Sequence, residues 1–304
     1  MAAIDLQLNG YKGVDFNDDN LTAEALRVAC QAIVADGGQK MLATVITDHL
    51  DLMVSRIKRL ANLREQNELI SDVMVGIHVE GPFISPITGF VGAHPTEHVL
   101  PATVAHAKNI VAAGNGLIRV VTLAPEHDAD FKTTQWLSRQ NILVSAGHCN
   151  PSVEVLSAAI DAGLSAFTHL GNGCPIDMHR HNNIINRVLA ADGLRWIMII
   201  PDGIHLPPSL VRTMIRSIGI ERIIAVTDAT AAGGMGVGEF SLGSQKVIVE
   251  QDGSAWASGR SHLVGSTASM GRVRDVLQND IGLSKQEIIQ ITEINPAMAL
   301  NHKK

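Results

Sequence analysis

Side chains that could hold a metal and move protons stand at the ends of short apolar runs in this 304-residue sequence. Glu80, His148 and His169 offer one carboxylate and two imidazoles, the ligand types that borderline divalent metals such as zinc prefer. We expect these three to form a catalytic metal site whose fourth position is open to water. Asp228 follows the last apolar run and suits a general base that takes a proton from that water.

Polar residues close the other apolar runs in the same way. The eight runs end at Gln7-Leu-Asn9-Gly10, Thr47-Asp48-His49, His78-Val-Glu80-Gly81-Pro82, Pro125-Glu126-His127, Gly147-His148-Cys149-Asn150, Thr168-His169-Leu-Gly-Asn172, Pro201-Asp202-Gly-Ile-His205 and Thr227-Asp228-Ala229. Any one of these residues alone is better explained as a turn cap or as a side chain at the edge of the core. Their agreement at eight run ends favours one shared site.

The elements that must position these side chains follow from the hydropathy pattern. The apolar runs occupy residues 4–8, 41–46, 73–79, 118–123, 142–146, 166–169, 196–200 and 223–226. Amphipathic stretches lie between them, at residues 22–35, 50–63, 103–113, 152–162 and 208–217. Continuous apolar runs are typical of parallel strands buried on both faces and linked by helices. Eight strand–helix units predict a (β/α)8 TIM barrel rather than a doubly wound open sheet, and the strand ends then share one rim.

The pattern changes after the eighth run. Residues 239–248 and 253–258 are predicted to form a β-hairpin around Gln251-Asp252-Gly253, and helical character returns at residues 269–277. We therefore expect one domain over residues 1–304, with the hairpin at 239–258 inserted between the last strand and its helix.

Composition excludes several classes of partner. The net charge is −6 and no basic patch is visible, so we expect no nucleic-acid partner. No apolar run approaches the ~20 residues that span a bilayer, and the first residues do not resemble a secretion signal, so we expect a cytoplasmic protein without a membrane partner. Cys30, Cys149 and Cys174 are widely spaced and predict no disulfide framework. Cys149 is a rival metal ligand, but we expect it to be a buried structural thiol.

Five segments together resemble the amidohydrolase superfamily and, within it, the N-acetylglucosamine-6-phosphate deacetylase family, over nearly the full chain. They are Asp5-Leu-Gln-Leu-Asn-Gly10; His78-Val-Glu-Gly-Pro-Phe83 with Gly92-Ala-His94; Gly147-His148; Thr168-His-Leu-Gly-Asn-Gly173; and Asp202-Gly-Ile-His205 followed by Thr227-Asp-Ala229. One such segment would be a weak signal, whereas five in this order are specific.

The resemblance implies roles for the polar residues at the rim. Glu80, His148 and His169 would hold the metal, Asp228 would be the catalytic acid and base, and His94 would polarise the acetamide carbonyl. Many amidohydrolases use a His-x-His pair after strand one for a second metal, but this chain has Gln7 and Asn9 there. Amides bind zinc poorly, so we expect one divalent metal, with zinc favoured.

The resemblance also implies a site for a sugar phosphate. The substrate-binding residues would be Gln7, Asn172, Gly173, Arg180 and His205. In relatives, the residues at the positions of Arg180 and His205 reach the phosphate in the neighbouring protomer's site, which implies a homodimer with shared active sites. A guanidinium suits phosphate because it donates two parallel charge-assisted bonds. The alternative for Arg180 is a solvated loop charge.

The chain departs from the family pattern in two places. Family members usually carry residues before the first strand and after the last helix that build a small β-sandwich beside the barrel, and we expect only the 239–258 hairpin of that sandwich here. The apolar face of that hairpin must then pack on the barrel, pair with another protomer, or stay loose. Residues 177–183 are also richer in histidine than a phosphate loop requires.

We expect a metal-dependent deacetylase that hydrolyses the acetamide of an N-acetylhexosamine 6-phosphate, N-acetylglucosamine 6-phosphate above all. Two alternatives remain open from the sequence: the same machinery acting on a different amide or cyclic amide, and a non-catalytic sugar-phosphate-binding barrel. The complete set of Glu80, His148, His169 and Asp228 argues against the non-catalytic alternative, because a binding protein gains nothing from a general base.

Overall fold

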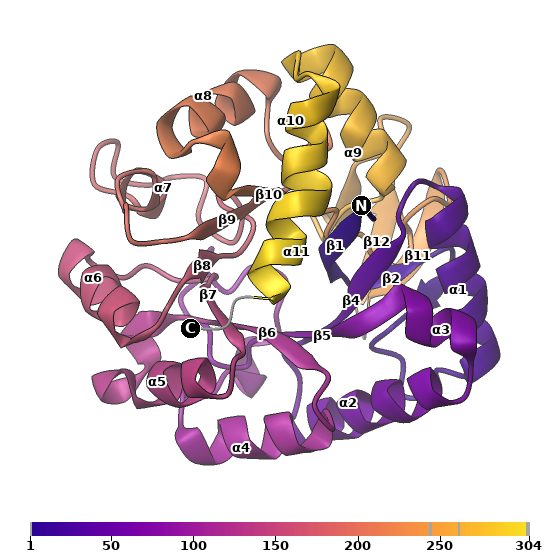
Figure 1. The fold of residues 1–304 in the computed structure, drawn as a ribbon, viewed down its shortest axis with the longest axis horizontal. Coiled ribbons are helices and arrows are strands. Elements are labelled where there is room, and N and C mark those ends of the chain that lie inside the picture. Colours follow the sequence, from indigo (N-terminus) through magenta and orange to yellow (C-terminus); the bar gives the residue numbers. More distant parts are fainter. Residues whose placement is uncertain (1, 243–244, 261, 302–304) are drawn as a thin grey trace.

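The computed structural model describes residues 2–242, 245–260 and 262–301. Within these residues, one sheet of eight parallel strands has the order β1-β4-β5-β6-β7-β8-β9-β10. A parallel bridge between Leu8 and Ala229 links its two edges, so the sheet closes into the predicted (β/α)8 barrel (Figure 1). The strands are β1 (Ile4–Leu8), β4 (Lys40–Ile46), β5 (Met74–Glu80), β6 (Ile118–Leu123), β7 (Leu143–Ala146), β8 (Ala166–Phe167), β9 (Trp196–Ile199) and β10 (Ile223–Ala225).

Helices follow each barrel strand and pack around the outside of the barrel (Figure 1). They are α1 (Ala23–Ala35), α2 (Leu50–Glu65), α3 (Glu68–Val73), α4 (Val104–Ala113), α5 (Lys132–Arg139), α6 (Val153–Ala162), α7 (Ile184–Leu189), α8 (Pro208–Ile218), α9 (Met270–Val276), α10 (Lys285–Ile289) and α11 (Asn295–Leu300). Short 3-10 turns lie at Thr96–His98, Pro125–His127, Ala129–Phe131 and Ile220–Arg222, and π-helical turns at Leu277–Ile281 and Gln290–Ile294. The sequence pattern did not single out α3, α5 and α7, which have at most eight residues each.

Hydroxyl side chains begin several of the helices that the sequence pattern predicted. Thr22, Thr103 and Ser152 are the N-caps of α1, α4 and α6, and each side-chain oxygen accepts a hydrogen bond from a backbone amide three residues ahead. Such caps satisfy amides that have no partner inside the helix. The predicted ranges therefore began at the cap, one residue before the helix itself.

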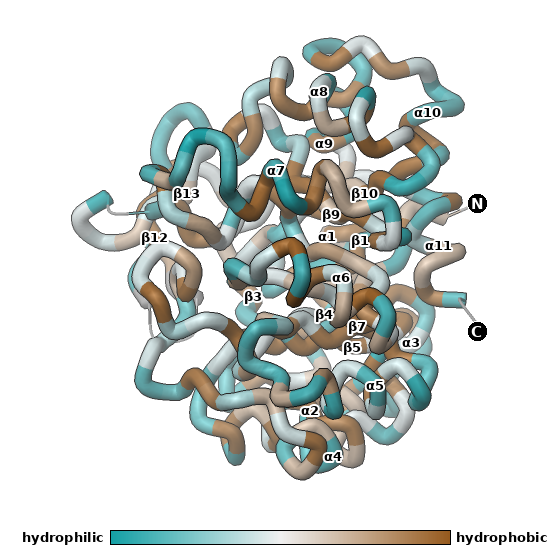
Figure 2. The backbone as a smooth tube through the Cα atoms, turned by 90° about the vertical axis from the view of Figure 1, so that its left-hand side faces the viewer, coloured by the Kyte–Doolittle hydropathy of each residue, from teal (hydrophilic) through white to brown (hydrophobic). Residues whose placement is uncertain are grey.

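The interior of the barrel is layered. Apolar side chains including Leu42, Val120, Trp196 and Ile224 fill its lower part, and α11 packs against them from below, crossing the end of the barrel in Figure 1. Figure 2 shows hydrophobic strands at the centre of the molecule and hydrophilic loops at its margins.

A polar layer lies above the apolar one. Nδ1 of His78 lies 2.9 Å from the Leu6 carbonyl, and its Nε2 lies 2.7 Å from Oγ1 of Thr122. Oγ1 of Thr168 continues the chain at 2.7 Å from both Oγ1 of Thr122 and Oγ of Ser145. Burial lowers the pKa of His78 to about 4, so its ring is a neutral structural member of this layer. The layer supports the strand ends that carry Glu80 and His169.

The insertion after β10 forms three antiparallel strands, β11 (Gly238–Leu242), β12 (Gln245–Val249) and β13 (Ala255–Ala257). The hairpin predicted around Gln251-Asp252-Gly253 is the β12–β13 pair. The predicted first arm, residues 239–248, is itself folded into two strands. Val247, Val249, Ala255 and Ala257 form an apolar face that packs against Ile46 and Ala93, so of the three expected arrangements the barrel-packed one is found.

The two-stranded ribbon β2 (Gly10–Tyr11) and β3 (Val14–Asp15) completes the sheets of the described chain. In the part that the structure describes, none of the helices combines the length and the apolar character needed to cross a membrane.

Candidate active site

The three predicted metal ligands meet at the rim where the barrel strands end. Oε1 of Glu80 lies 2.8 Å from Nε2 of His169 and 3.2 Å from Nε2 of His148. The two imidazole nitrogens lie 3.1 Å apart, and all three side chains are buried. Burial alone would raise the pKa of Glu80, but its close contacts with the two imidazoles hold that pKa well below its usual range. The carboxylate is therefore charged.

The hydrogen bonds of this cluster indicate that it fits a cation. Nδ1 of His148 lies 2.8 Å from the carbonyl oxygen of Phe90, which can only accept, so a neutral His148 carries its proton there. Its Nε2 lone pair then faces the Glu80 carboxylate and Nε2 of His169. Three electron-rich atoms at such short range are stabilised by a shared divalent ion, and a backbone carbonyl on the far ring nitrogen is the usual support of a metal-binding histidine.

Glycine is required on both sides of His148. A Cβ atom on Gly92 would lie 3.0 Å from Cε1 of His148, and one on Gly173 would lie 3.0 Å from the same ring and 3.2 Å from Cε1 of His169. Both glycines have positive φ, +60° and +61°, a conformation that favours glycine. The lack of a side chain at Gly173 thus lets its backbone lie close to the ligand rings.

Three site residues occupy strained backbone conformations. His148, His169 and Asp228 have φ values of +51°, +36° and +51°, in the left-handed region that non-glycine residues rarely adopt. Each follows the end of a strand, where this bend turns the side chain toward the barrel axis. Strain of this kind persists only where surrounding contacts enforce it, and it clusters at functional sites.

The two amides at the end of β1 bind the two carboxylates of the site. Gln7 donates from Nε2 to Oε1 of Glu80 over 3.0 Å, and Asn9 donates from Nδ2 to Oδ1 of Asp228 over 2.8 Å. The register of β1 against β4 shifts between Asp5 and Leu8, an irregularity that re-aims the intervening side chains. Both amides at the end of β1 are thus hydrogen-bonded to carboxylates of the site.

Asp228 lies in an environment that favours a proton on its carboxyl group. Burial, together with the charge of Glu80, raises the pKa of Asp228 to about 8, although His169 and the hydrogen bond from Asn9 oppose the shift. A bound divalent cation would act with His169 and favour the carboxylate. A carboxyl group that changes protonation near neutral pH is suited to general acid and base work.

His94 stands over His148 on the loop that follows β5. The two ring centroids are 4.4 Å apart with the rings nearly perpendicular, at 77°. Burial lowers the pKa of His94 to about 3, and the neighbouring His148 adds to the effect. Its Nδ1 is buried and has no hydrogen-bond partner among the described residues. His94 is therefore a neutral imidazole with a nitrogen available to a ligand.

Asp202 fixes the predicted phosphate residue His205. The backbone amides of Ile204 and His205 both donate to Oδ1 of Asp202 over 2.8 Å, and Nδ1 of His205 donates to Oδ2 over 2.7 Å. Burial alone would raise the pKa of Asp202, but the bonds from His205 hold it below its usual value. With Nδ1 committed to Asp202, Nε2 is the ring atom of His205 that can meet a ligand. Asn172 offers a buried Nδ2 that lacks a partner within the described chain.

Arg180 lies apart from the metal-ligand cluster. It is exposed on the loop before α7, and in the residues described its guanidinium has no ion pair or hydrogen bond. The structure does not bring it to the ligands of its own chain.

Cys149 is buried as predicted. Burial raises the pKa of its thiol well above the usual range, which disfavours the thiolate that binds metal.

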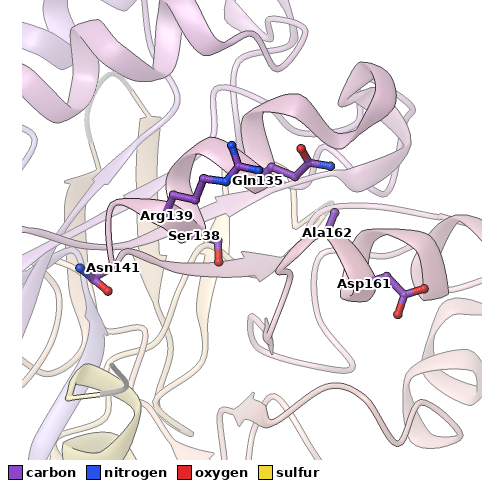
Figure 3. A pocket seen from close by; sticks show the side chains of 6 residues that line it. All are labelled: Gln135, Ser138, Arg139, Asn141, Asp161 and Ala162. Carbon is purple, nitrogen blue, oxygen red and sulfur yellow. The ribbon is translucent and has the colours of Figure 1, made fainter. Parts of the chain in front are cut away.

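A separate cleft lies at the opposite end of the barrel. It has a volume of about 420 Å³ and is lined by Gln135, Ser138, Arg139, Asn141, Asp161 and Ala162, which come from the C-terminal ends of α5 and α6 and the turn before β7 (Figure 3). It contains none of the predicted site residues.

Sequence reasoning missed several contributors to the rim. Asn9 was noted only as a poor metal ligand, whereas it binds Asp228. Gly92 was part of a matching segment, but its contact with His148 has no signal in one sequence. Arg187 on α7 was also missed, because in the sequence it has the pattern of an ordinary charge on a helix surface.

We compared the sequence and the structure of this chain with those of known proteins. No protein-family model matches the chain. It is 32% identical over 299 residues to the N-acetylglucosamine-6-phosphate deacetylase of Bacillus subtilis, covering 98% of this chain and 74% of the relative. It is 31% identical over 294 residues to the N-acetylgalactosamine-6-phosphate deacetylase of a Shewanella strain, covering 97% and 72%. A mutant N-acetyl-D-glucosamine-6-phosphate deacetylase from Mycobacterium smegmatis, solved in complex with N-acetyl-D-glucosamine-6-phosphate, matches with a TM-score of 0.89 at 27% identity over 99% of this chain and 77% of that chain.

Proposed function

The chain belongs to the N-acetylglucosamine-6-phosphate deacetylase family of the amidohydrolase superfamily, and from this we propose that it hydrolyses the acetamide of an N-acetylhexosamine 6-phosphate to the free amine and acetate. The observation that carries the proposal is the meeting of Glu80, His148 and His169 at one rim position, with Asp228 and His94 beside them. This set suits amide hydrolysis, which needs an activated water, an oxyanion stabiliser and a proton shuttle.

The chain's own residues divide this work. Neutral His94 donates a hydrogen bond to the amide carbonyl and stabilises the charge that develops on its oxygen. Asp228 takes the proton of the attacking water and passes it to the leaving amine, while Asn9 holds its carboxyl group in place. Gln7 orients Glu80 and lies where it can also contact substrate.

Glu80, His148 and His169 would hold one divalent metal, for which we propose zinc because two imidazoles and a carboxylate form a zinc donor set. When bound, the ion supplies Lewis-acid polarisation and lowers the pKa of the attacking water to about 7. We expect metal analysis of the purified, zinc-loaded protein to find one equivalent per chain. Two equivalents would contradict the single site, and none would contradict the ligand assignment.

The phosphate end of the site is proposed to consist of Arg180, His205, Asn172 and the backbone of Gly173. The exposed guanidinium of Arg180 supports a role across a subunit boundary, because none of the residues that the structure describes forms an ion pair with it. We accordingly propose a homodimer in which Arg180 and His205 complete the partner's site.

An acetate-release assay tests this function. The substrates are N-acetylglucosamine 6-phosphate, N-acetylgalactosamine 6-phosphate and the two unphosphorylated sugars, each with and without zinc. We expect metal-dependent acetate release with a clear preference for a phosphorylated sugar, and the two epimers separate the substrate classes that the relatives' names give. Absence of acetate from every hexosamine, with metal shown to be bound, would contradict the proposal.

A further inference from the structure

The loop that carries Arg180 is ordered by side chains of its own flanks. Nδ1 of His179 accepts hydrogen bonds from the backbone amides of His181 and Asn182, over 3.3 and 2.9 Å. Asn183 donates to the carbonyl of His179, and Asn186 donates to the carbonyl of His181, each over 3.0 Å. The backbone is thus held on both sides of Arg180, while its guanidinium remains exposed.

One guanidinium connects this loop to the barrel. Arg187 on α7 donates from Nε to Oδ1 of Asn182 over 2.8 Å and from Nη2 to the carbonyl of Asn182 over 3.2 Å. Its Nη1 donates to Oδ1 of Asn150 over 2.9 Å and to the carbonyl of Pro151 over 2.6 Å. The backbone amide of Asn150 donates in turn to Glu126 at the end of β6. Arg187 therefore joins the loop to the segment that follows the metal ligand His148.

We propose that Arg187 is a positioning residue, which holds the loop of residues 177–183 so that Arg180 is presented in the conformation that binds phosphate. The inference rests on the proposed phosphate role of Arg180. Arg187 is half-buried and its hydrogen bonds use Nε and both terminal nitrogens, so it acts through its fork geometry rather than as a free charge. Figure 1 shows α7 at the outer edge of the barrel, between α6 and α8.

The hydrogen bonds from three nitrogens of Arg187 predict how its substitution changes the binding of substrate. Without Arg187, the loop samples other conformations and the population that presents Arg180 correctly falls, which weakens apparent affinity by the same fraction. We expect Arg187→Ala to raise KM for the phosphorylated substrate about tenfold and to leave kcat within about twofold. Arg187→Lys should behave like the alanine variant, because one ammonium cannot replace bonds from three nitrogens.

A double-mutant cycle separates positioning from a merely structural role. KM and kcat are measured for wild type, Arg180→Ala, Arg187→Ala and the double variant, with phosphorylated and unphosphorylated sugar. If Arg187 acts through Arg180, its replacement has no further effect on KM once Arg180 is absent, and KM for the unphosphorylated sugar does not change. Equal effects of Arg187→Ala in both backgrounds, or full recovery by Arg187→Lys, would overturn the inference.

Controls separate this outcome from unfolding and from failure of the proposed function. Arg222 also holds backbone carbonyls, those of Ala191 and Leu194, and Arg222→Ala is expected to lower the melting temperature without changing KM. If Arg187→Ala does not fold, Asn182→Ala removes one of its acceptors and should raise KM in the same direction by less; an unchanged KM would then overturn the inference. No effect of Arg180→Ala would overturn the phosphate role itself, and the positioning role with it.

Discussion

At the proposed metal end of the site, Glu80, His148 and His169 are buried at the ends of barrel strands, whereas at the proposed phosphate end Arg180 is exposed on a loop. The metal end is held by the barrel itself, through neighbouring strands and through the hydroxyl layer around His78. The phosphate end is held by local bonds from asparagine, histidine and Arg187.

This difference separates chemistry from recognition. A rigid, water-poor cluster suits groups that must stabilise charge as it develops, since no reorganisation is then needed. A loop at the surface suits recognition of an anion whose charge does not change during the reaction. Substitutions at the metal end should therefore act on kcat, and substitutions at the phosphate end on KM.

The largest effect is expected from Asp228→Asn. An amide cannot accept the proton of the attacking water, so turnover should fall at least ~100-fold, as is typical for loss of a general acid or base. Zinc content and substrate affinity should stay close to wild type. The measurement is single-turnover acetate release together with metal analysis. Retention of more than about a third of the wild-type rate, with chemistry rate-limiting, would leave Asp228 outside the proton transfer.

Arg180→Ala tests the proposed phosphate end of the site. Charge-assisted bonds to an anion are worth about 1.5 to 3 kcal/mol each, so KM for the phosphorylated sugar should rise roughly ten- to a hundredfold. The unphosphorylated sugar should be insensitive to the change. A drop in kcat with unchanged KM would mean that the two ends are not functionally separate.

Mixing variants tests whether the phosphate end belongs to the partner subunit. A heterodimer of an Arg180→Ala chain with an Asp228→Asn chain has one site in which the phosphate residue and the base both come from unmodified positions. Activity should therefore return on subunit exchange. If exchange is shown by mass and no activity returns, Arg180 acts within its own chain or does not contact phosphate.

Residues at strand ends could be predicted from the sequence, whereas contacts between loops could not. His148, His169 and Asp228 directly follow apolar runs, and barrel geometry brings all strand ends to one rim, so their convergence was predictable. Their positive φ values were not, because neither histidine nor aspartate signals such a bend. Arg187 was missed because its acceptors Asn150 and Pro151 lie 37 and 36 residues away, and the contact depends on how two loops pack.

The insertion after β10 was predicted only in part. Its β-character was predictable from alternation, but residues 239–248 form two strands instead of one. The break falls at Gly243-Ser244, outside the described residues, and this glycine–serine pair is a turn signal that could have divided the run.

Gly173→Ala should weaken metal binding by about tenfold, the lower end of the range for residues that support metal ligands. The added methyl group would lie 3.0 Å from the His148 ring and 3.2 Å from His169, so the ligand rings must move apart. Gly116→Ala is the matched control, because Gly116 also has positive φ, +83°, but no neighbour within 4 Å of the added carbon. Competition with a zinc chelator measures both. Equal effects of the two substitutions would indicate backbone strain alone.

The smallest effect is expected at the cleft between α5 and α6. This cleft has a volume of about 420 Å³, yet it lies at the end of the barrel where the strands begin, and active sites of barrel enzymes lie at the other end. Arg139→Ala and Asp161→Ala should therefore leave kcat and KM within about twofold of wild type, since surface substitutions away from a site change little. The matched comparison is Arg180→Ala, which removes an exposed guanidinium at the opposite rim. If Arg139→Ala raised KM for the phosphorylated sugar as much as Arg180→Ala did, phosphate recognition would lie in the cleft, and the division between a buried chemical end and an exposed recognition end of one site would be wrong.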